Sequence, residues 1–322
     1  HIGGGFSRYS VDKKWHVPHF EKMLYDNAQM VSLYSNAYLA TKDNLYKEVV
    51  TQTLAFVARE CTNSEGAFYS SFDADSLTQD GNLEEGAYYV FTKEELTKEL
   101  GEDVELFSTY YNINSFGLWE NNHYVLIRSK SDPEVCAAFG ITNQVLQNKK
   151  EAWRKALLSY RNKRDKPRLD DKILTSWNGL MLKGYVNAYS VFQEDKFLQM
   201  ALKNAHFIQN NMVKEDGGLY RNFKNGQSKI EAYLEDYATV IDAYISLYEA
   251  TLDENWLQTA KQLADYSYDH FYDIESKMFF FTSDKETNLI ARKMEIDDNV
   301  IPSSNSIMAN NLFKLGHYFE NK

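Results

Sequence analysis

The sequence predicts an all-α fold, a toroid in which helical hairpins stand side by side around an axis. Aromatic residues recur eight positions apart in three segments, a short polar turn separates each pair, and a long connection follows each segment. The paired aromatics are Tyr38 and Tyr46, Tyr189 and Phe197, and Tyr248 and Trp256. Repeats that cannot bury their apolar faces alone must stack on their neighbours.

Each repeat is predicted to contain a helix, a short turn, a second helix and a loop. In the first helix of the second repeat, Leu180, Gly184 and Ala188 recur at helical spacing. Because the turn is short, the two helices should pack antiparallel. A fourth repeat begins at Asn305 and stops at the chain end, so we expect an incomplete ring.

Long connections join successive hairpins, at about 63–176, 214–235 and 274–304. All should emerge on one face, where the first helices begin, and binding residues concentrate on such loops. The stretch 66–167 is predicted to be an insertion with short strands at 88–91 and 124–127 and helices at 93–100 and 143–160. We see no separate core in it and expect one partial toroid domain over 1–322.

The composition narrows the class of ligand. The formal net charge of the 322 residues is −11, which argues against nucleic acid and anionic membranes and favours a neutral or cationic ligand. Aromatic residues make up 15% of the chain; most should pack between helices, but some could stack on sugar rings.

Other features predict the compartment and the absence of cofactors. Cys61 and Cys136 match no metal or redox spacing, and two reduced thiols suit the cytoplasm. His16 and His19 lack further ligands nearby for zinc, so we expect no metal and no cofactor. No membrane span or signal peptide is visible. The chain begins at His1 without Met, so we expect a piece of a longer protein.

The first chemical cluster precedes the first helix, in residues 15–27. His19 and Glu21 could act as general base and acid, and Asp26 lies at the start of the helix. Helix capping and ion pairs explain the same residues equally well.

Further polar clusters lie on the predicted loop face. Asp73, Asp75 and Glu85 could supply the paired carboxyls of glycoside hydrolysis, or form a solvated acidic turn. The remaining candidates open later helices, where helix capping is the competing explanation. They are Asp171, Trp177, Asn178, Glu235, Asp236, Tyr237, Ser303 and Asn305. In a ring, Asp26, Trp177, Asp236 and Asn305 would share one repeat position and line a common funnel.

Several motifs together resemble the family of spermatogenesis-associated protein 20 and its bacterial relatives. They are Gly3 to Asp12, Val17 to Ala28, Asp73 to Ser76, Glu85 to Tyr89, Asp170 to Lys172, Ser176 to Leu180, Leu234 to Ala238 and Pro302 to Ser306. Arg8, Tyr9 and Trp15 lie within or beside the first two motifs, and we expect them to contact substrate. One position differs, because Phe91 stands where the family pattern leads us to expect Trp.

The resemblance implies an (α/α)6 toroid of the six-hairpin glycosidase type, similar to N-acylglucosamine 2-epimerase. It also implies a thioredoxin-like domain, N-terminal to the toroid, that this sequence does not include. No established reaction comes with the resemblance, and no epimerase motif carries catalytic residues across.

Three functional hypotheses follow. The chain could be a carbohydrate-active enzyme, either an epimerase-like isomerase using His19, Glu21 and Asp236, or a hydrolase using two of the carboxylates. It could instead be a non-catalytic scaffold that binds a glycan, peptide or small molecule. It could also be a structural ring whose polar face only caps helices. The expected partner is a small molecule or oligosaccharide.

Overall fold

In the computed structural model, the described residues are 2–286 and 290–320, and they form two compact units. The first unit comprises 1–22 and 72–169, and the second comprises 23–71 and 170–322. The chain crosses between them within three short strands, β1 (Lys22–Met23), β2 (Ser71–Phe72) and β7 (Leu169–Asp170).

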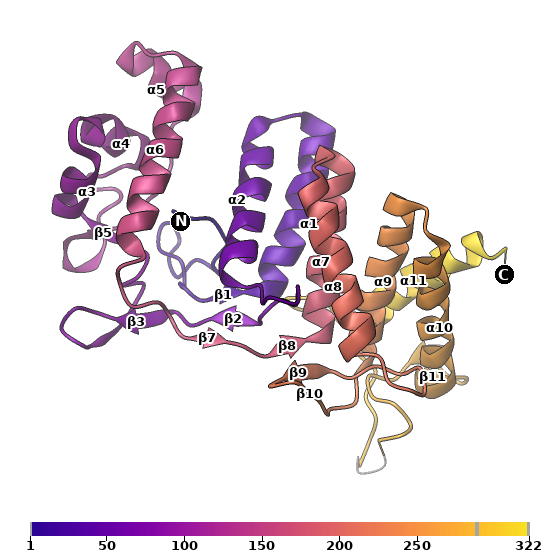
Figure 1. Cartoon of the computed structure of the whole chain (residues 1–322). Helices are drawn as coiled ribbons and strands as arrows, with labels where there is room; N and C mark the ends of the chain where they lie inside the picture. The colour runs from indigo at the N-terminus through magenta and orange to yellow at the C-terminus, as the bar shows by residue number, and fades with distance from the viewer. Residues whose placement is uncertain (1, 287–289, 321–322) are drawn as a thin grey trace. The chain divides into compact units, whose positions relative to one another are not determined.

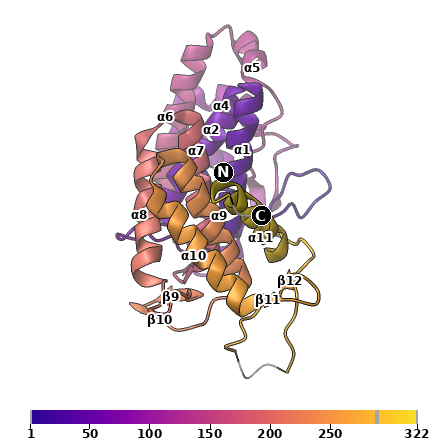
Figure 2. The same ribbon diagram turned by 90° about the vertical axis from the view of Figure 1, so that its right-hand side faces the viewer.

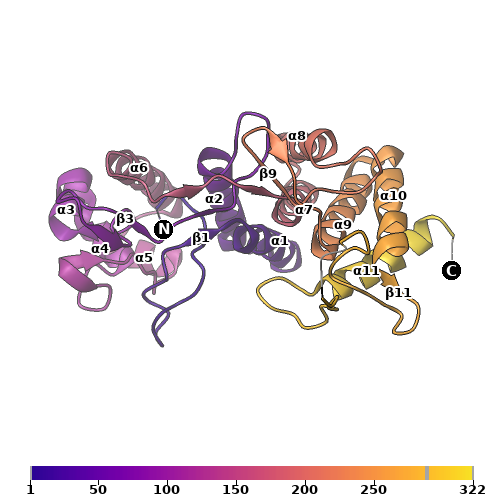
Figure 3. The same ribbon diagram turned by 90° about the horizontal axis from the view of Figure 1, so that it is seen from below.

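The second unit contains the predicted hairpins. They are α1 (Leu24–Thr41) with α2 (Asn44–Glu60), α7 (Thr175–Phe192) with α8 (Asp195–Asn211), and α9 (Leu234–Thr251) with α10 (Glu254–Phe271). The first helices pack in the order α1, α7, α9, and α11 (Ser304–Tyr318) packs against α9 (Figure 2). Each second helix packs on its own first helix, which gives the inner and outer rows of a toroid (Figure 3).

The repeated aromatics mark one helix end in every hairpin. Each first helix ends at a left-handed residue four positions after the first aromatic: Lys42 at φ 60°, Gln193 at φ 55° and Leu252 at φ 58°. The backbone N–H of each donates to the carbonyl of the repeated tyrosine, which satisfies one of the unpaired groups at the helix end. The same turn is therefore built three times.

The long connections of this unit carry short antiparallel strands. β8 (Ile173–Leu174), β9 (Asn222–Lys224) and β10 (Gln227–Ser228) form one sheet, in the order β10-β9-β8. β11 (Tyr272–Asp273) pairs with β12 (Met278–Phe279). Figure 1 shows β8 to β11 at the lower end of the hairpins and the short turns at the upper end, as the connection lengths predict.

The first unit holds four α-helices in the described residues, α3 (Lys93–Leu100), α4 (Val104–Tyr111), α5 (Asp132–Phe139) and α6 (Asn143–Arg161). β3 (Asp75–Leu77) pairs with β4 (Leu83–Glu85), and β5 (Phe91–Thr92) pairs with β6 (His123–Tyr124). The predicted helices at 93–100 and 143–160 are confirmed. The predicted strands at 88–91 and 124–127 overlap the observed two-residue strands at one residue each, Phe91 in β5 and Tyr124 in β6.

This unit has apolar clusters of its own, contrary to our reading of a segment without a core. Phe107, Tyr110 and Trp153 belong to the larger cluster, and Phe20 and Tyr89 to a smaller one. The contributing residues come from several elements that do not repeat one another, so no regular pattern in the sequence indicates this core. The prediction of one toroid domain with an insertion stays a prediction.

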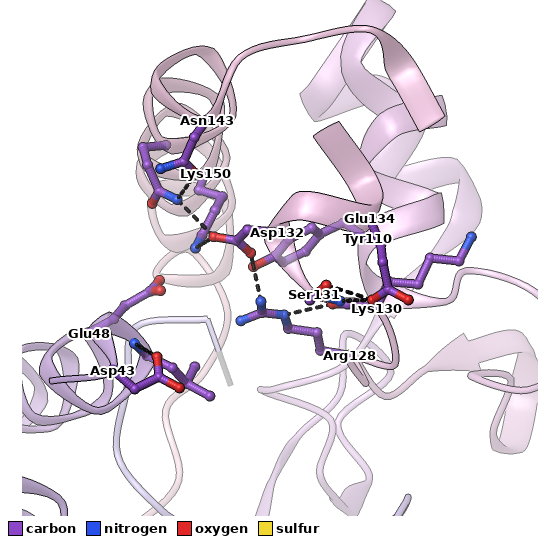
Figure 4. A network of polar contacts seen from close by, with 12 residues as sticks. Asp43, Glu48, Tyr110, Arg128, Lys130, Ser131, Asp132, Glu134, Asn143 and Lys150 are labelled. Carbon is purple, nitrogen blue, oxygen red and sulfur yellow. Dashed lines mark hydrogen bonds and ion pairs between the residues drawn. The ribbon is translucent and has the colours of Figure 1, made fainter. Parts of the chain in front are cut away.

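A partly buried carboxylate network joins three helical segments of the first unit (Figure 4). Asp132 accepts hydrogen bonds from Tyr110 Oη at 2.9 Å, Arg128 Nη2 at 2.7 Å and Lys150 Nζ at 3.2 Å. Burial alone would raise the pKa of Asp132, but these donors and cations hold it below its usual value. The network fixes α5 against α4 and α6.

Candidate functional site

Asp236 has the most constrained environment of the predicted site residues. It is fully buried at the start of α9, and its Oδ1 accepts from the Ser176 N–H of α7 at 2.8 Å. Its Oδ2 accepts from Tyr233 N at 2.9 Å and from Arg221 Nη1 at 3.2 Å. Burial raises the pKa of Asp236 to about 6, against the opposing charge of Arg221. The carboxylate therefore ties together the first turns of two inner helices.

A second polar contact recurs where each hairpin meets the next. Asn178 Oδ1 accepts from the Phe68 N–H at 2.9 Å, and Tyr237 Oη accepts from the Leu219 N–H at 2.8 Å. Asn305 Oδ1 does the same for the backbone N–H of β12, at 2.9 Å. The predicted residues Asn178, Tyr237 and Asn305 thus hold the loop of the preceding hairpin against the following helix.

The remaining predicted residues of the second unit have varied surroundings. Ser303 caps α11 by accepting from the Ser306 N–H at 3.3 Å. Trp177 meets the ring of Tyr25 edge-on at 4.8 Å. Exposed Asp171 pairs with a lysine of β9 at 2.5 Å, and half-buried Asp26 lies in the first turn of α1.

Glu235 accepts a hydrogen bond from Arg221 Nη1 at 2.6 Å, and the guanidinium also lies 4.5 Å from the centroid of the Tyr233 ring. Arg221 therefore links the two adjacent acids of α9. The sequence-based search did not single out this arginine, because its partners lie 14 and 15 residues further along the chain.

The first unit brings five predicted residues into one cluster around His19. The Nδ1 of His19 lies 2.7 Å from Glu85 Oε1, and its Nε2 lies 3.6 Å from Glu21 Oε2. Arg8 Nη1 donates to Glu21 Oε2 at 3.1 Å, and the Tyr9 ring stacks on the imidazole with centroids 5.0 Å apart. The His19 side chain is 25% exposed, so ligands can reach it.

Backbone contacts hold this cluster in place. His19 N donates to Tyr9 O at 2.8 Å, and Arg8 N donates to Glu21 O at 3.2 Å, so the N-terminal segment runs beside residues 19–21. The buried Lys22 donates from Nζ to the carbonyls of Gly4 at 2.7 Å and Gly5 at 2.9 Å. These contacts span 18 and 17 residues, so the sequence gives no local signal for them.

A glycine also places Glu85. Gly86 has φ 74°, and a Cβ there would lie 2.6 Å from the Phe20 ring. Only glycine therefore lets this turn close on Phe20, whose N–H donates to Glu85 Oε1 at 3.1 Å. Asp75 is the cross-strand partner of Glu85, and Asp73 lies 3.5 Å from Arg168.

A cavity of about 420 Å³ opens beside the cluster, with Glu85, Phe20 and Trp119 among its lining residues. The loop that carries Trp15 also contributes Val11 and Val17 to the lining. Trp15 itself is 81% exposed and adopts φ 57°, an unusual conformation for a bulky residue. The sequence-based search missed Trp119, which lies outside every repeat.

Metal ligands and membrane spans also bear on function. Within the described ranges, no three His, Cys, Asp or Glu side chains are grouped so as to hold a metal ion. None of the helices in the described part of the chain is long and apolar enough to cross a membrane.

Comparison with solved structures supports the fold assignment. Cellobiose 2-epimerase from Bacillus thermoamylovorans superposes with a TM-score of 0.55 at 12% identity, covering 98% of this chain and 61% of that one. UGL with dGlcA-Glc-Rha-Glc gives 0.52 at 12% identity, covering 98% and 63%. The predicted toroid fold is confirmed, and it is a fold used by carbohydrate-active proteins.

Comparison of sequences shows the family. Residues 167–293 match the family described as beta-L-arabinofuranosidase, GH127 catalytic domain. Spermatogenesis-associated protein 20 is 34% identical in Homo sapiens, over 98% of this chain, and 31% identical in Mus musculus, over 100% of it. The chain spans 44% and 45% of the lengths of these two relatives. The resemblance seen in the motifs is thus confirmed, and over the span compared this chain belongs to the spermatogenesis-associated protein 20 family.

Proposed function

We propose that this chain is a carbohydrate-active enzyme that moves a proton on the carbon next to a sugar carbonyl, as sugar epimerases and isomerases do. One observation carries the proposal: the accessible imidazole of His19 lies between two carboxylates, one of which, Glu85, lines a cavity. The toroid fold and the names of the similar proteins favour sugar as the substrate class by analogy.

The geometry suits an imidazole base. The contact between Nδ1 and Glu85 fixes the ring and its tautomer, because a carboxylate partner favours a proton on that nitrogen. The Nε2 atom then accepts the proton from the substrate carbon. Arg8 lies close enough to Glu21 to place a positive charge near the oxyanion that forms when the carbon loses its proton. Water then delivers a proton to the other face of the carbon, and the partly exposed imidazolium of His19 releases its proton to solvent, which completes epimerisation and restores the base.

Proton NMR in D₂O tests this proposal directly. The chain would be incubated with reducing mono- and disaccharides, and we expect one ring-proton signal to disappear while an epimer appears. His19→Gln should slow the exchange at least about 100-fold, because general acid–base catalysis contributes about that much or more. His206→Gln, an exposed histidine of the second unit, is the matched control.

Other outcomes point elsewhere. If new reducing ends appeared, and if Glu21→Gln and Glu85→Gln lost this activity to the same extent, the result would favour hydrolysis over epimerisation. Unchanged spectra across the panel would contradict an enzyme of either kind. They would favour one of the two non-catalytic hypotheses. One observation supports the structural ring: Asp236, Asn178 and Asn305 use polar atoms to hold backbone.

A further inference from the structure

A second cavity of the first unit adjoins the one beside His19. Its volume is about 620 Å³, and the two cavities share the lining residues Glu84, Ala87, Asn121 and His123. Both volumes fall in the range of about 300–1,000 Å³ that is usual for small-molecule sites. A single sugar beside Glu85 would leave the second cavity unfilled.

The far wall of the second cavity is rigid. Arg164 of this wall donates to the backbone carbonyls of Val90 at 2.6 Å and Ala87 at 3.0 Å, and to Glu95 Oε1 at 2.9 Å. The same carboxylate oxygen accepts from Tyr160 Oη at 2.8 Å. A wall fixed by several charge-assisted hydrogen bonds offers a preformed surface, which lowers the cost of ordering on binding.

The chemistry of the two linings differs in a useful way. The first cavity has aromatic rings, where Trp119 packs on Phe20 with centroids 5.4 Å apart. The second is lined mainly by amide, hydroxyl and charged side chains, such as Gln79, Asp80 and Lys163. Aromatic faces followed by hydrogen-bonding groups suit a chain of hydroxylated rings better than an apolar ligand.

We propose that the two cavities form one groove that binds an oligosaccharide. One terminal sugar lies beside His19 and Glu85, and the following units pass Asn121 and His123 into the second cavity. The assignment of sugar as the ligand rests on the proposed function, whereas the groove itself rests on the shared wall.

Calorimetry on the full chain tests the groove. Glucose, mannose and arabinose would each be compared with their di-, tri- and tetrasaccharides. For at least one series, we expect the trisaccharide to bind about tenfold more tightly than the monosaccharide. Asn121→Gly should abolish this gain, so that mono- and trisaccharide bind the variant with similar affinity. Glycine is chosen because Asn121 has φ 52°, which glycine adopts without strain.

The neighbouring Asn122 provides a matched control. It has φ 58°, is exposed and lines neither cavity, so Asn122→Gly should keep the length dependence. His123→Ala removes a second polar group of the shared wall and should reproduce the loss seen with Asn121→Gly. Far-UV circular dichroism would verify that each variant is folded.

The outcomes separate the groove from the catalytic proposal. Three results would overturn the groove. They are equal affinities for short and long sugars, an equal loss of the length-dependent gain in Asn121→Gly and Asn122→Gly, and no binding by any series. Length-dependent binding that only the shared-wall variants remove, without proton exchange in D₂O, would uphold the groove and contradict the epimerase. Exchange on monosaccharides without length dependence would uphold the epimerase and contradict the groove.

Discussion

The central inner helix, α7, approaches both of its neighbours through glycine. A Cβ added at Gly179 would lie 2.9 Å from the backbone carbon of Thr239 in α9. At Gly184 the nearest atom would be the carbonyl oxygen of Ala28 in α1, at 3.1 Å. Both obstacles are backbone, which cannot rotate away as a flexible side chain could. The spacing of the inner helices therefore depends on the absence of side chains at these two positions.

Gly179→Ala sets two effects against each other. Alanine is favoured over glycine in a helix interior by about 1 kcal/mol. Forcing an extra methyl group into a packed interface costs about 1–3 kcal/mol. The contact at Gly179 is shorter than real Cβ contacts, so we expect packing to dominate and the free energy of unfolding to fall by up to about 2 kcal/mol. Gly184→Ala should cost less, because its contact is 0.2 Å longer (3.1 − 2.9 Å).

Urea unfolding followed by far-UV circular dichroism measures these changes. Ser190→Ala, at an exposed position of the same helix, reports helix propensity without the packing clash. We expect that control to be neutral or slightly stabilising. If Gly179→Ala stabilised the protein by the full propensity difference, α7 and α9 would not be in close contact, and the packing argument would be refuted.

Two further predictions concern contacts in each unit. Tyr237→Phe leaves the buried Leu219 N–H without its acceptor, so the free energy of unfolding should fall by about 1–3 kcal/mol, whereas Tyr244→Phe, whose hydroxyl makes only a 3.4 Å contact, should cost less. In the first unit, burial opposes ionisation of Glu95, but the Thr92 N–H and Arg164 hold its pKa below the usual value. The stability that ionised Glu95 contributes to the folded state is therefore present above the unfolded-state pKa of about 4.3. It is lost as the pH falls through the lower pKa of the folded state. The free energy of unfolding, measured by urea titration, should therefore fall less between neutral and acid pH in Glu95→Gln than in the unmodified protein. An equal fall in both proteins would contradict this.

The helical hairpins were predictable because their signal is local and repeated. Tyr38, Tyr189 and Tyr248 each precede a turn by a fixed interval, and the structure ends a helix at the same place every time. The left-handed conformation of Leu252 was not predictable, since glycine or asparagine usually occupies such positions. Tertiary packing of the hairpin overrides the local preference there.

The first unit was harder to predict because its core is assembled from distant pieces. Trp153 of α6 meets Phe107 of α4 edge-on with centroids 5.3 Å apart, although 46 residues separate them in the sequence (153 − 107). The cluster around His19 has the same character. His19 and Glu21 attracted attention as neighbours, but the contact of His19 with Glu85 spans 66 residues. Residue types can nominate candidates, whereas only the fold determines which of them meet.

A carboxylate at a helix start, such as Asp236, can take part in catalysis or can hold the helix start in place. One variant separates these two roles. Asp236→Asn preserves the shape of the side chain but replaces one acceptor oxygen with an amide donor. Three donors surround the carboxylate, so either orientation of the amide leaves at least one of them facing another donor. We expect the free energy of unfolding at pH 7.5 to fall by about 1–3 kcal/mol. Asp265→Asn, an exposed i,i+4 partner of Lys261, should change it by less than about 0.5 kcal/mol. If Asp236→Asn abolished turnover and left stability unchanged, the residue would belong to the chemistry, and its role as a link between two inner helices would be refuted.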